Sequence, residues 1–191
     1  MIRTFVAIDL PRAIQGGLAQ FVQILQRANA PVSWVKPDRI HLTLKFLGDV
    51  HEERIPSLCD ALQSVSDAAE PFSIQPAGCG AFPSIKQMRV VWVGLRGDVE
   101  ALRSLQARVE ESLKPLGFEP EGRPFRAHLT VGRVKGSQRA RVLQQALLDN
   151  QSFSTEAFDV TELVLYKSEL RPEGAQYTPL CRAAFPAGRT Q

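Results

Sequence analysis

The hydrophobic positions near the N-terminus change from a strand pattern to a helix pattern and back. Residues 3–9 contain a short run of strand-forming residues, Phe5 to Ile8. Pro11 is suited to the first turn of a helix, and the apolar positions that follow at helical spacing are Ile14, Leu18, Phe21, Val22 and Leu25. Residues 40–47 alternate in part, which predicts a strand that stops at a turn formed by Gly48 and Asp49.

The middle of the chain predicts two helices and two strands. One helix is expected within 52–69, with an apolar face made of Ile55, Leu58, Leu62 and Val65. Strands are expected at 72–74 and 89–93, joined by an irregular connection because glycine and proline residues lie between them. A third helix is predicted from Asp98, which can cap it, to Gly117.

The last third predicts one more strand–helix pair and three strands. The strand covers 126–135, and Ser137 can cap a helix that contains the apolar positions of 142–147. Further strands are expected within 153–160, 161–166 and 177–185, followed by a tail at 186–191. The pattern is that of an α+β protein with four helices, and the length favours a single domain over 1–191.

Composition excludes several classes of protein. The chain has 191 residues, of which 44% are apolar and 23% charged, as in globular domains, and no apolar run approaches the roughly 18 residues of a membrane span. The N-terminus meets Asp9 too early for a secretory signal, so we expect a cytoplasmic protein without a membrane partner. The net charge of +3 permits a polyanionic partner but does not require one.

The three cysteines predict neither a disulfide framework nor a zinc site. Cys59, Cys79 and Cys181 are far apart and form no C-x-x-C pair, so we expect them to be reduced and buried.

One short pattern occurs twice at an offset of 87 residues. His41-Leu42-Thr43-Leu44 and His128-Leu129-Thr130-Val131 each lie on a predicted strand, where histidine and threonine share one face and the apolar residues share the other. Two of the three histidines in the chain have a threonine two residues on, which chance explains poorly. The third histidine, His51, lacks this partner and is expected to be a surface residue.

Paired imidazoles beside hydroxyl groups suit displacement at phosphorus. One histidine can deprotonate a nucleophile while the other protonates the leaving oxygen, because the ordinary imidazole pKa lies near neutrality. Thr43 and Thr130 can donate hydrogen bonds to the non-bridging oxygens. Zinc or di-metal catalysis fits less well, since no H-E-x-x-H pattern and no matching acidic residue are found, and no G-x-S-x-G nucleophile site is visible. No metal or other cofactor is therefore expected.

These residues resemble those of the two-histidine phosphoesterase superfamily, in particular its RNA 2′,3′-cyclic phosphodiesterase branch, also called 2′-5′ RNA ligase. The resemblance rests on the two H-x-T-x motifs and on the segments Phe5–Ile8, Trp34–Pro37, Lys45–Gly48, Gly80–Pro83, Arg89–Gly94, Pro124–Arg126, Ser168–Leu170 and Gly174–Tyr177. The chain departs from the family where Ala127 replaces the usual proline before the second histidine. This substitution affects the stiffness of the backbone rather than the chemistry.

The resemblance implies a bilobal fold in which two pseudo-symmetric lobes, each with an antiparallel sheet and helices, flank a cleft. It implies hydrolysis of RNA 2′,3′-cyclic phosphate ends to 2′-phosphate ends, with His41 as proton donor and His128 as proton acceptor. It also implies that the same residues can join RNA through a 2′-5′ bond without ATP, when an RNA 5′-hydroxyl replaces water as the nucleophile. The expected partner is RNA with a cyclic phosphate end, such as a tRNA fragment, and the expected state is a monomer.

Substrate-binding candidates follow from their position relative to the motifs. Lys45 has the strand parity of His41, and Arg126 has that of His128, whereas Arg133 shares the face only if Gly132 marks a bulge. Four aromatic residues are candidates for stacking on a base: Trp34, Phe46, Phe82 and Phe125.

Two other functions remain open at this point. The same residues would serve hydrolysis of a small cyclic phosphate, such as an ADP-ribose cyclic phosphate or a cyclic nucleotide. A non-catalytic RNA-binding module could also retain the cleft.

Overall fold

The computed structural model describes residues 1–172 and 174–186 and has two antiparallel sheets. The strand order is β3-β1-β8-β9 in the four-stranded sheet and β2-β6-β5-β4-β7 in the five-stranded sheet. The strands are β1 (Ile2–Ile8), β2 (Val32–Trp34), β3 (Leu42–Val50), β4 (Phe72–Ser84), β5 (Gln87–Gly97), β6 (Leu129–Val134), β7 (Phe158–Val160), β8 (Glu162–Arg171) and β9 (Gly174–Ala184). The helices are α1 (Arg12–Gln26), α2 (Ile55–Asp67), α3 (Val99–Leu113) and α4 (Ala140–Asp149), and short 3-10 turns lie at Pro37–Arg39, Glu52–Arg54 and Lys114–Leu116. This confirms the predicted α+β class with four helices.

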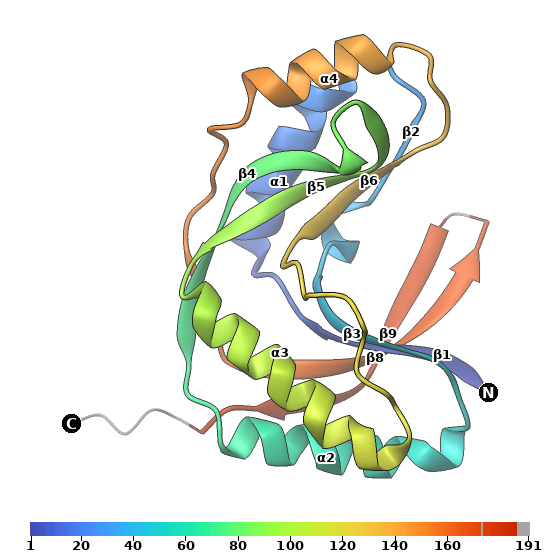
Figure 1. Cartoon of the computed structure of the whole chain (residues 1–191), viewed down its shortest axis with the longest axis vertical. Coiled ribbons are helices and arrows are strands. Elements are labelled where there is room, and N and C mark those ends of the chain that lie inside the picture. The colour runs from blue at the N-terminus through green and yellow to red at the C-terminus, as the bar shows by residue number, and fades with distance from the viewer. Residues whose placement is uncertain (173, 187–191) are drawn as a thin grey trace.

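The two sheets form two lobes, and the chain crosses between them repeatedly. Figure 1 shows α1 and α4 with β2, β4, β5 and β6 in the upper lobe, and α2 and α3 with β1, β3, β8 and β9 in the lower lobe. Strand β1 therefore belongs to the lower lobe, although α1, the next element along the chain, belongs to the upper one. None of the helices in the described residues is long and apolar enough to cross a membrane.

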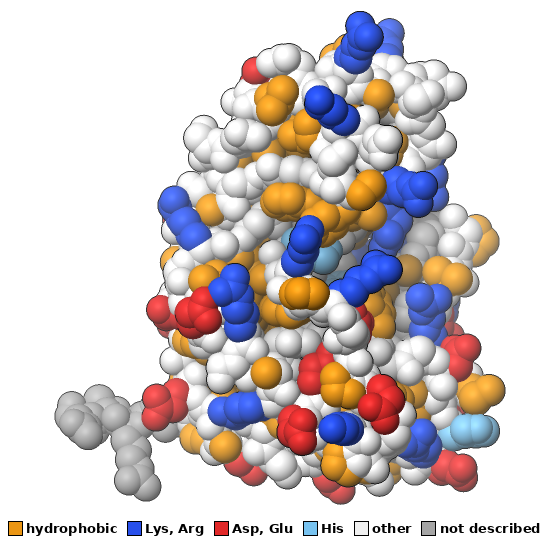
Figure 2. Space-filling model, viewed as in Figure 1, with side chains coloured by type: hydrophobic (Ala, Val, Ile, Leu, Met, Phe, Trp, Pro, Cys, Tyr) orange, Lys and Arg blue, Asp and Glu red, His pale blue; other side chains and the backbone are white. Residues whose placement is uncertain are grey.

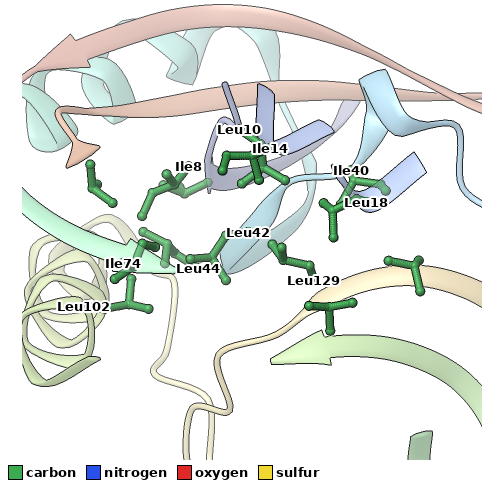
Figure 3. Packing of buried hydrophobic residues seen from close by; sticks show 14 of the residues in the cluster. Ile8, Leu10, Ile14, Leu18, Ile40, Leu42, Leu44, Ile74, Leu102 and Leu129 are labelled. Atoms are coloured by element: carbon green, nitrogen blue, oxygen red, sulfur yellow. The ribbon is translucent and has the colours of Figure 1, made fainter. Parts of the chain in front are cut away.

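One buried cluster joins the two lobes behind the motif strands. Leu42 and Leu44 of β3 and Leu129 of β6 lie in the same packed group as Ile14 and Leu18 of α1 (Figure 3). Leu42 and Leu129 are completely buried, because they occupy the strand face opposite to the histidine and threonine. Burial of each such side chain stabilises the fold by roughly 1.5–3 kcal/mol, so the apolar positions of both motifs contribute directly to the core.

Each motif strand contains a bulge directly after its threonine. In β3, Thr43 pairs with Ala7 and Lys45 with Val6, which leaves Leu44 without a partner on β1. In β6, Thr130 pairs with Trp92 and Gly132 with Val91, which leaves Val131 without a partner on β5. A bulge adds one residue to one strand, so every position beyond it changes face relative to simple alternation.

Several predicted boundaries were wrong because glycine and proline were interpreted as ends of strands. Strand β3 continues through Gly48, which has a φ of 71°, and β4 runs without interruption through the expected irregular connection. At each of these places the pairing register shifts, so the residue marks a bulge inside a strand. Strand β6 begins only at Leu129, helix α4 is preceded by Arg139 rather than capped by Ser137, and the three-residue strand β2 was not predicted.

Two cysteines form a disulfide, contrary to the expectation that all three are reduced. Cys59 of α2 and Cys181 of β9 are bonded, with a Cα–Cα distance of 6.1 Å and a sequence separation of 122 residues. Spacing along the chain cannot reveal this pair, since the packing of α2 against β9 brings the two residues together. Cys79 is free and buried as expected, and burial raises the pKa of its thiol to about 11. Of the tail predicted at 186–191, residues 187–191 lie outside the described residues.

Replacing both bonded cysteines, Cys59→Ser and Cys181→Ser, should lower the free energy of unfolding by about 2–4 kcal/mol, because the bond closes a long loop in the unfolded chain. Urea unfolding with and without dithiothreitol measures this. The reductant should shift the midpoint of the unmodified protein and leave that of the double variant unchanged. Equal midpoints for both proteins without reductant would contradict the bond.

Candidate active site

The two motif histidines are held in the same way by the backbone. His41 and His128 each lie one residue before a strand, and their Nδ1 atoms are 3.0 and 2.7 Å from the carbonyl oxygens of Arg39 and Arg126, respectively. A carbonyl can only accept a hydrogen bond, so Nδ1 carries the hydrogen in each ring. The Nε2 atom of each neutral imidazole is therefore left with a lone pair for chemistry.

Aromatic rings enclose His41 on the four-stranded sheet. The Phe5 ring stacks on the imidazole at a centroid distance of 4.7 Å, and the Tyr177 ring meets it edge-on at 4.9 Å. Burial lowers the pKa of His41 below the ordinary value of 6.5, although the hydrogen bond to the Arg39 carbonyl and the negative charge of Asp9 act in the opposite direction. The enclosed imidazole is thus biased toward its neutral form in the free protein.

His128 has a more open environment on the other lobe. Its ring contacts Phe82 edge-on at a centroid distance of 5.0 Å, and Phe82 in turn packs against Trp92. Figure 2 shows a histidine in a recess at mid-height of the molecule, bordered by Lys or Arg side chains and by hydrophobic ones. The motifs repeat in sequence, but the two imidazoles have different surroundings.

The two threonines lie where the motif pattern predicts. Thr43 faces Ala7 of β1 and Thr130 faces Trp92 of β5 across their ladders, and both are half-buried. Within the described part of the chain, no side chain or carbonyl engages either hydroxyl. Both hydroxyls can therefore donate a hydrogen bond to a group bound beside the histidines.

The bulges place Arg133 and Phe46 on the same face as the threonines. Arg133 pairs with Val90, and Thr130 pairs with Trp92. Val90 and Trp92 are two positions apart and lie on the same side of β5, so Arg133 shares the face of Thr130. The sequence predicted this face for Arg133 only if a bulge occurred at Gly132. By the same shift in β3, Phe46 faces Phe5, at a ring distance of 5.9 Å, and remains 55% exposed. The two residues are 87 positions apart, so they occupy corresponding places in the two motifs.

The prediction that Lys45 shares the face of His41 was wrong. The bulge at Leu44 turns Lys45 to the core side, where it is 3% exposed and forms an ion pair with Glu110 of α3. Its ammonium also donates to the Glu119 carbonyl at 2.8 Å. The Lys45 side chain therefore joins β3 to α3 through Glu110 and is not available to a substrate.

The other predicted contact residues lie in several places. Arg126 precedes β6 and is exposed, so strand parity does not apply to it, while Phe125 is half-buried against the core. Trp34 lies on the helix-facing side of β2, where its ring covers Gly132 and lines a groove beside α1. Among the aromatic candidates, Phe46 and Phe82 face the histidine side.

Comparison with known proteins identifies the family. The model of the LigT-like phosphoesterase family matches the chain twice, over residues 8–92 and 93–177. The chain belongs to the LigT-like phosphoesterases. A relative from Methanothermobacter thermautotrophicus named RNA 2′,3′-cyclic phosphodiesterase is 35% identical over 94% of this chain and 96% of its own. Another with the same name, from Archaeoglobus fulgidus, is 36% identical over 94% of this chain and 98% of its own.

Solved structures share the bilobal fold of this chain. The crystal structure of TT0787 from Thermus thermophilus superimposes with a TM-score of 0.76 at 26% identity, covering 96% of this chain and 98% of the other. The Escherichia coli LigT structure with 3′-AMP gives a TM-score of 0.75 at 26% identity, covering 97% and 99%. The resemblance inferred from the two motifs is therefore confirmed.

In this LigT-like protein, several residues near the histidines were not predicted. Phe5 and Tyr177 enclose His41. Burial raises the pKa of the Tyr177 hydroxyl, and the positive charges of Arg133, Arg39 and Arg3 act in the opposite direction. The segments of Phe5 and Tyr177 carried the family resemblance, but a single strand gives no indication of which residue faces a histidine 36 or 136 positions away. In the described residues, no group of three or more His, Cys, Asp and Glu side chains is placed to hold a metal ion.

Lys45→Met should lower the free energy of unfolding by about 3–5 kcal/mol, because it leaves the buried carboxylate of Glu110 without its cation. The rate of the folded variant should change little. Urea unfolding and initial rates measure the two effects. Arg103→Gln, which breaks an exposed pair with Glu100 on the same helix, is the control and should cost under about 1 kcal/mol. If Lys45→Met lost activity without losing stability, the result would show that Lys45 contacts the substrate and does not only stabilise the fold.

The His41 imidazole should titrate below the ordinary pKa of 6.5 in the free protein, and NMR of the ring protons measures this. Asp9→Asn should lower the pKa further, because the Asp9 charge favours the imidazolium. Glu70→Gln, at an exposed position, should leave it unchanged. A pKa above 6.5 in the free protein would show that the aromatic enclosure does not desolvate the ring.

Proposed function

We propose that the protein hydrolyses 2′,3′-cyclic phosphates at the 3′ ends of RNA to 2′-phosphates. The observation that carries this proposal is the pair of histidines on facing lobes, each with Nδ1 hydrogen-bonded to a carbonyl two residues upstream and Nε2 left for proton transfer. The names of the relatives from Methanothermobacter and Archaeoglobus support RNA as the substrate.

Proton transfer in this reaction requires the two imidazoles in opposite protonation states. The Nε2 atom of His128 takes a proton from water as the water oxygen bonds to phosphorus. The bond from phosphorus to O3′ breaks, and the protonated His41 gives its Nε2 proton to O3′. The products are a 3′-hydroxyl and a 2′-phosphate, with one water consumed, and such an acid–base pair produces a bell-shaped pH profile.

The surroundings of His41 imply that its proton is stabilised by the substrate. Burial favours the neutral ring in the free protein, whereas the acid of the reaction must be cationic. An anionic phosphate next to the ring raises the imidazole pKa, because opposite charges at close range favour the ionised form. We therefore infer that the pKa of His41 is higher in the complex than in the free protein.

Two threonines and one arginine are suited to hold the phosphoryl oxygens. The Thr43 and Thr130 hydroxyls share the faces of the histidines, and their hydrogen bonds to the non-bridging oxygens would stabilise charge in the transition state. Arg133, turned to this face by its bulge, supplies a cationic fork that pairs with phosphate oxygens. Phe46, half-exposed beside Phe5, offers a ring on which the terminal base can stack.

Several predictions from the sequence remain predictions. They include action without a metal or other cofactor, ligation through a 2′-5′ bond, tRNA fragments as substrate, a monomer in the cytoplasm, and a single domain over 1–191. The contacts of Arg126 and Phe125 with RNA have the same status.

His41→Ala and His128→Ala should each reduce turnover of a short RNA with a 2′,3′-cyclic phosphate end by about 10²–10⁴-fold, the usual contribution of a positioned acid or base. The assay contains EDTA, and phosphorus NMR identifies the product. Only the 2′-phosphate is expected. The double variant should lose less than the product of the two losses, because both groups act in one step.

His51→Ala replaces the third histidine, which is exposed, and should retain full activity. Thr43→Val and Thr130→Val should lower the rate but keep the shape of the pH profile, since no titrating group is removed. Full activity of either motif-histidine variant in a folded protein would refute the mechanism. Turnover of cyclic nucleotides but not of RNA would favour a small cyclic phosphate as substrate, and RNA binding without turnover would favour a binding module.

A further inference from the structure

Beyond the two motifs, the four-stranded sheet carries a polar row at the edge of the His41 enclosure. Arg3 of β1 lies opposite Ser168 of β8, and Ser168 lies opposite Tyr177 of β9. This row is two residues along from Phe5 and Tyr166, so its side chains share the face on which the Phe5 ring stacks against His41. The row therefore overlaps the aromatic enclosure of His41 at Tyr177.

A second guanidinium is anchored beside this row. The Nη1 atom of Arg39 donates to the carbonyl oxygen of Ala175 at 2.9 Å, two residues before Tyr177 on β9. The Arg39 carbonyl is also the group that holds Nδ1 of His41. One residue thus connects the orientation of the catalytic imidazole to the polar row.

In this row of three residues, Arg3 supplies the positive charge. Among the described residues, Arg3 forms no ion pair, and Asp49, which lies opposite Arg3 on β3, is not within salt-bridge distance of it. The charges of Arg3 and Arg39 both reach the Tyr177 hydroxyl, where they act against the effect of burial on its pKa. A guanidinium pair beside a hydroxyl is an arrangement that recognises a phosphodiester oxygen.

The proposed reaction places the ribose of the substrate on this side of the cleft. O3′ belongs to the ribose and receives its proton from His41, so the sugar lies against the His41 lobe, while the attacking water lies at His128. The same ribose is linked through O5′ to the next phosphate toward the 5′ end. That phosphate must therefore leave the reacting centre over the four-stranded sheet.

We propose that Arg3, Arg39 and Tyr177 bind the phosphodiester on the 5′ side of the reacting nucleotide, so that the preferred substrate has at least two nucleotides. This inference rests on the proposed function and specifies its substrate class. It distinguishes an RNA end from a free nucleoside cyclic phosphate, because only the RNA end carries the additional charged phosphate. The contact selects for chain length and not for the base.

Three substrates isolate the contribution of that phosphate. They are adenosine 2′,3′-cyclic phosphate, the dinucleotide ApA with a terminal 2′,3′-cyclic phosphate, and the same dinucleotide with an uncharged methylphosphonate linkage. We expect kcat/KM for the charged dinucleotide to exceed that for the mononucleotide by about tenfold or more, and the methylphosphonate to lose most of this advantage. Added salt should reduce the preference for the charged dinucleotide, as for any phosphate contact.

Variants of Arg3 and Tyr177 test whether the polar row causes the preference for the charged dinucleotide. Arg3→Gln should reduce the ratio of dinucleotide to mononucleotide kcat/KM by about tenfold, and Arg3→Lys should retain part of the ratio because it keeps the charge. Tyr177→Phe, which preserves the ring against His41, should reduce the ratio by a smaller factor. Arg141→Gln makes the same change of charge at an exposed position on α4 and should leave all rates unchanged.

The outcomes separate this inference from the proposed function. Hydrolysis of the mononucleotide with a ratio near one in the unmodified protein, or an unchanged ratio in Arg3→Gln, would overturn the subsite and leave the proposed function standing. Equal rates for the charged and methylphosphonate dinucleotides would also overturn it, and this comparison needs no variant. If the protein hydrolysed none of the three substrates, both the proposed function and the subsite would be overturned.

Discussion

The packing of apolar side chains behind the two motif strands determines how the histidines are placed. Leu42 and Leu44 of one motif and Leu129 and Val131 of the other belong to a single buried cluster that joins both lobes. Protein interiors are packed as densely as organic crystals, so neither strand can move without opening a void. The shared core therefore holds in place the two strands that follow His41 and His128.

The two halves of the site have the same backbone plan but different electrostatics. Each imidazole has its Nδ1 hydrogen committed to a carbonyl, whereas Phe5 and Tyr177 enclose only His41. Hydrolysis of a cyclic ester is asymmetric, since the leaving oxygen remains attached to a sugar and the entering oxygen comes from water. The enclosed lobe, with its aromatic rings and arginines, suits the sugar, and the more open lobe suits water.

The sequence predicted the two motifs and the faces of their residues better than the path of the chain around them. Alternation identified the faces of His41, Thr43, His128 and Thr130, because these residues precede the bulges. Beyond the bulges alternation failed, so Lys45 was assigned to the wrong face and Arg133 could be assigned only conditionally. The glycine at position 132 indicated a bulge in β6, because glycine within a strand is typical of bulges. No residue type indicated the bulge at Leu44 in β3.

Long-range neighbours were outside the reach of sequence patterns. Cys59 and Cys181, Lys45 and Glu110, and His41 and Tyr177 are each separated by more than 60 residues, and tertiary packing alone brings them together. Strand β2 was missed for a different reason, because three residues are too few to show a period. Local patterns therefore predicted the elements and motifs, while the environment of each imidazole required the fold.

The two family matches do not coincide with the two lobes. Residues 8–92 supply α1, β2 and most of β5 to the upper lobe but β3 and α2 to the lower one, and residues 93–177 are divided in the same way. Neither matched stretch therefore forms one lobe by itself, because each supplies elements to both sheets. Because both stretches lie in one polypeptide, corresponding positions can carry different residues. Position 46 is an aromatic residue where its counterpart, position 133, is an arginine, and two identical subunits could not carry that difference.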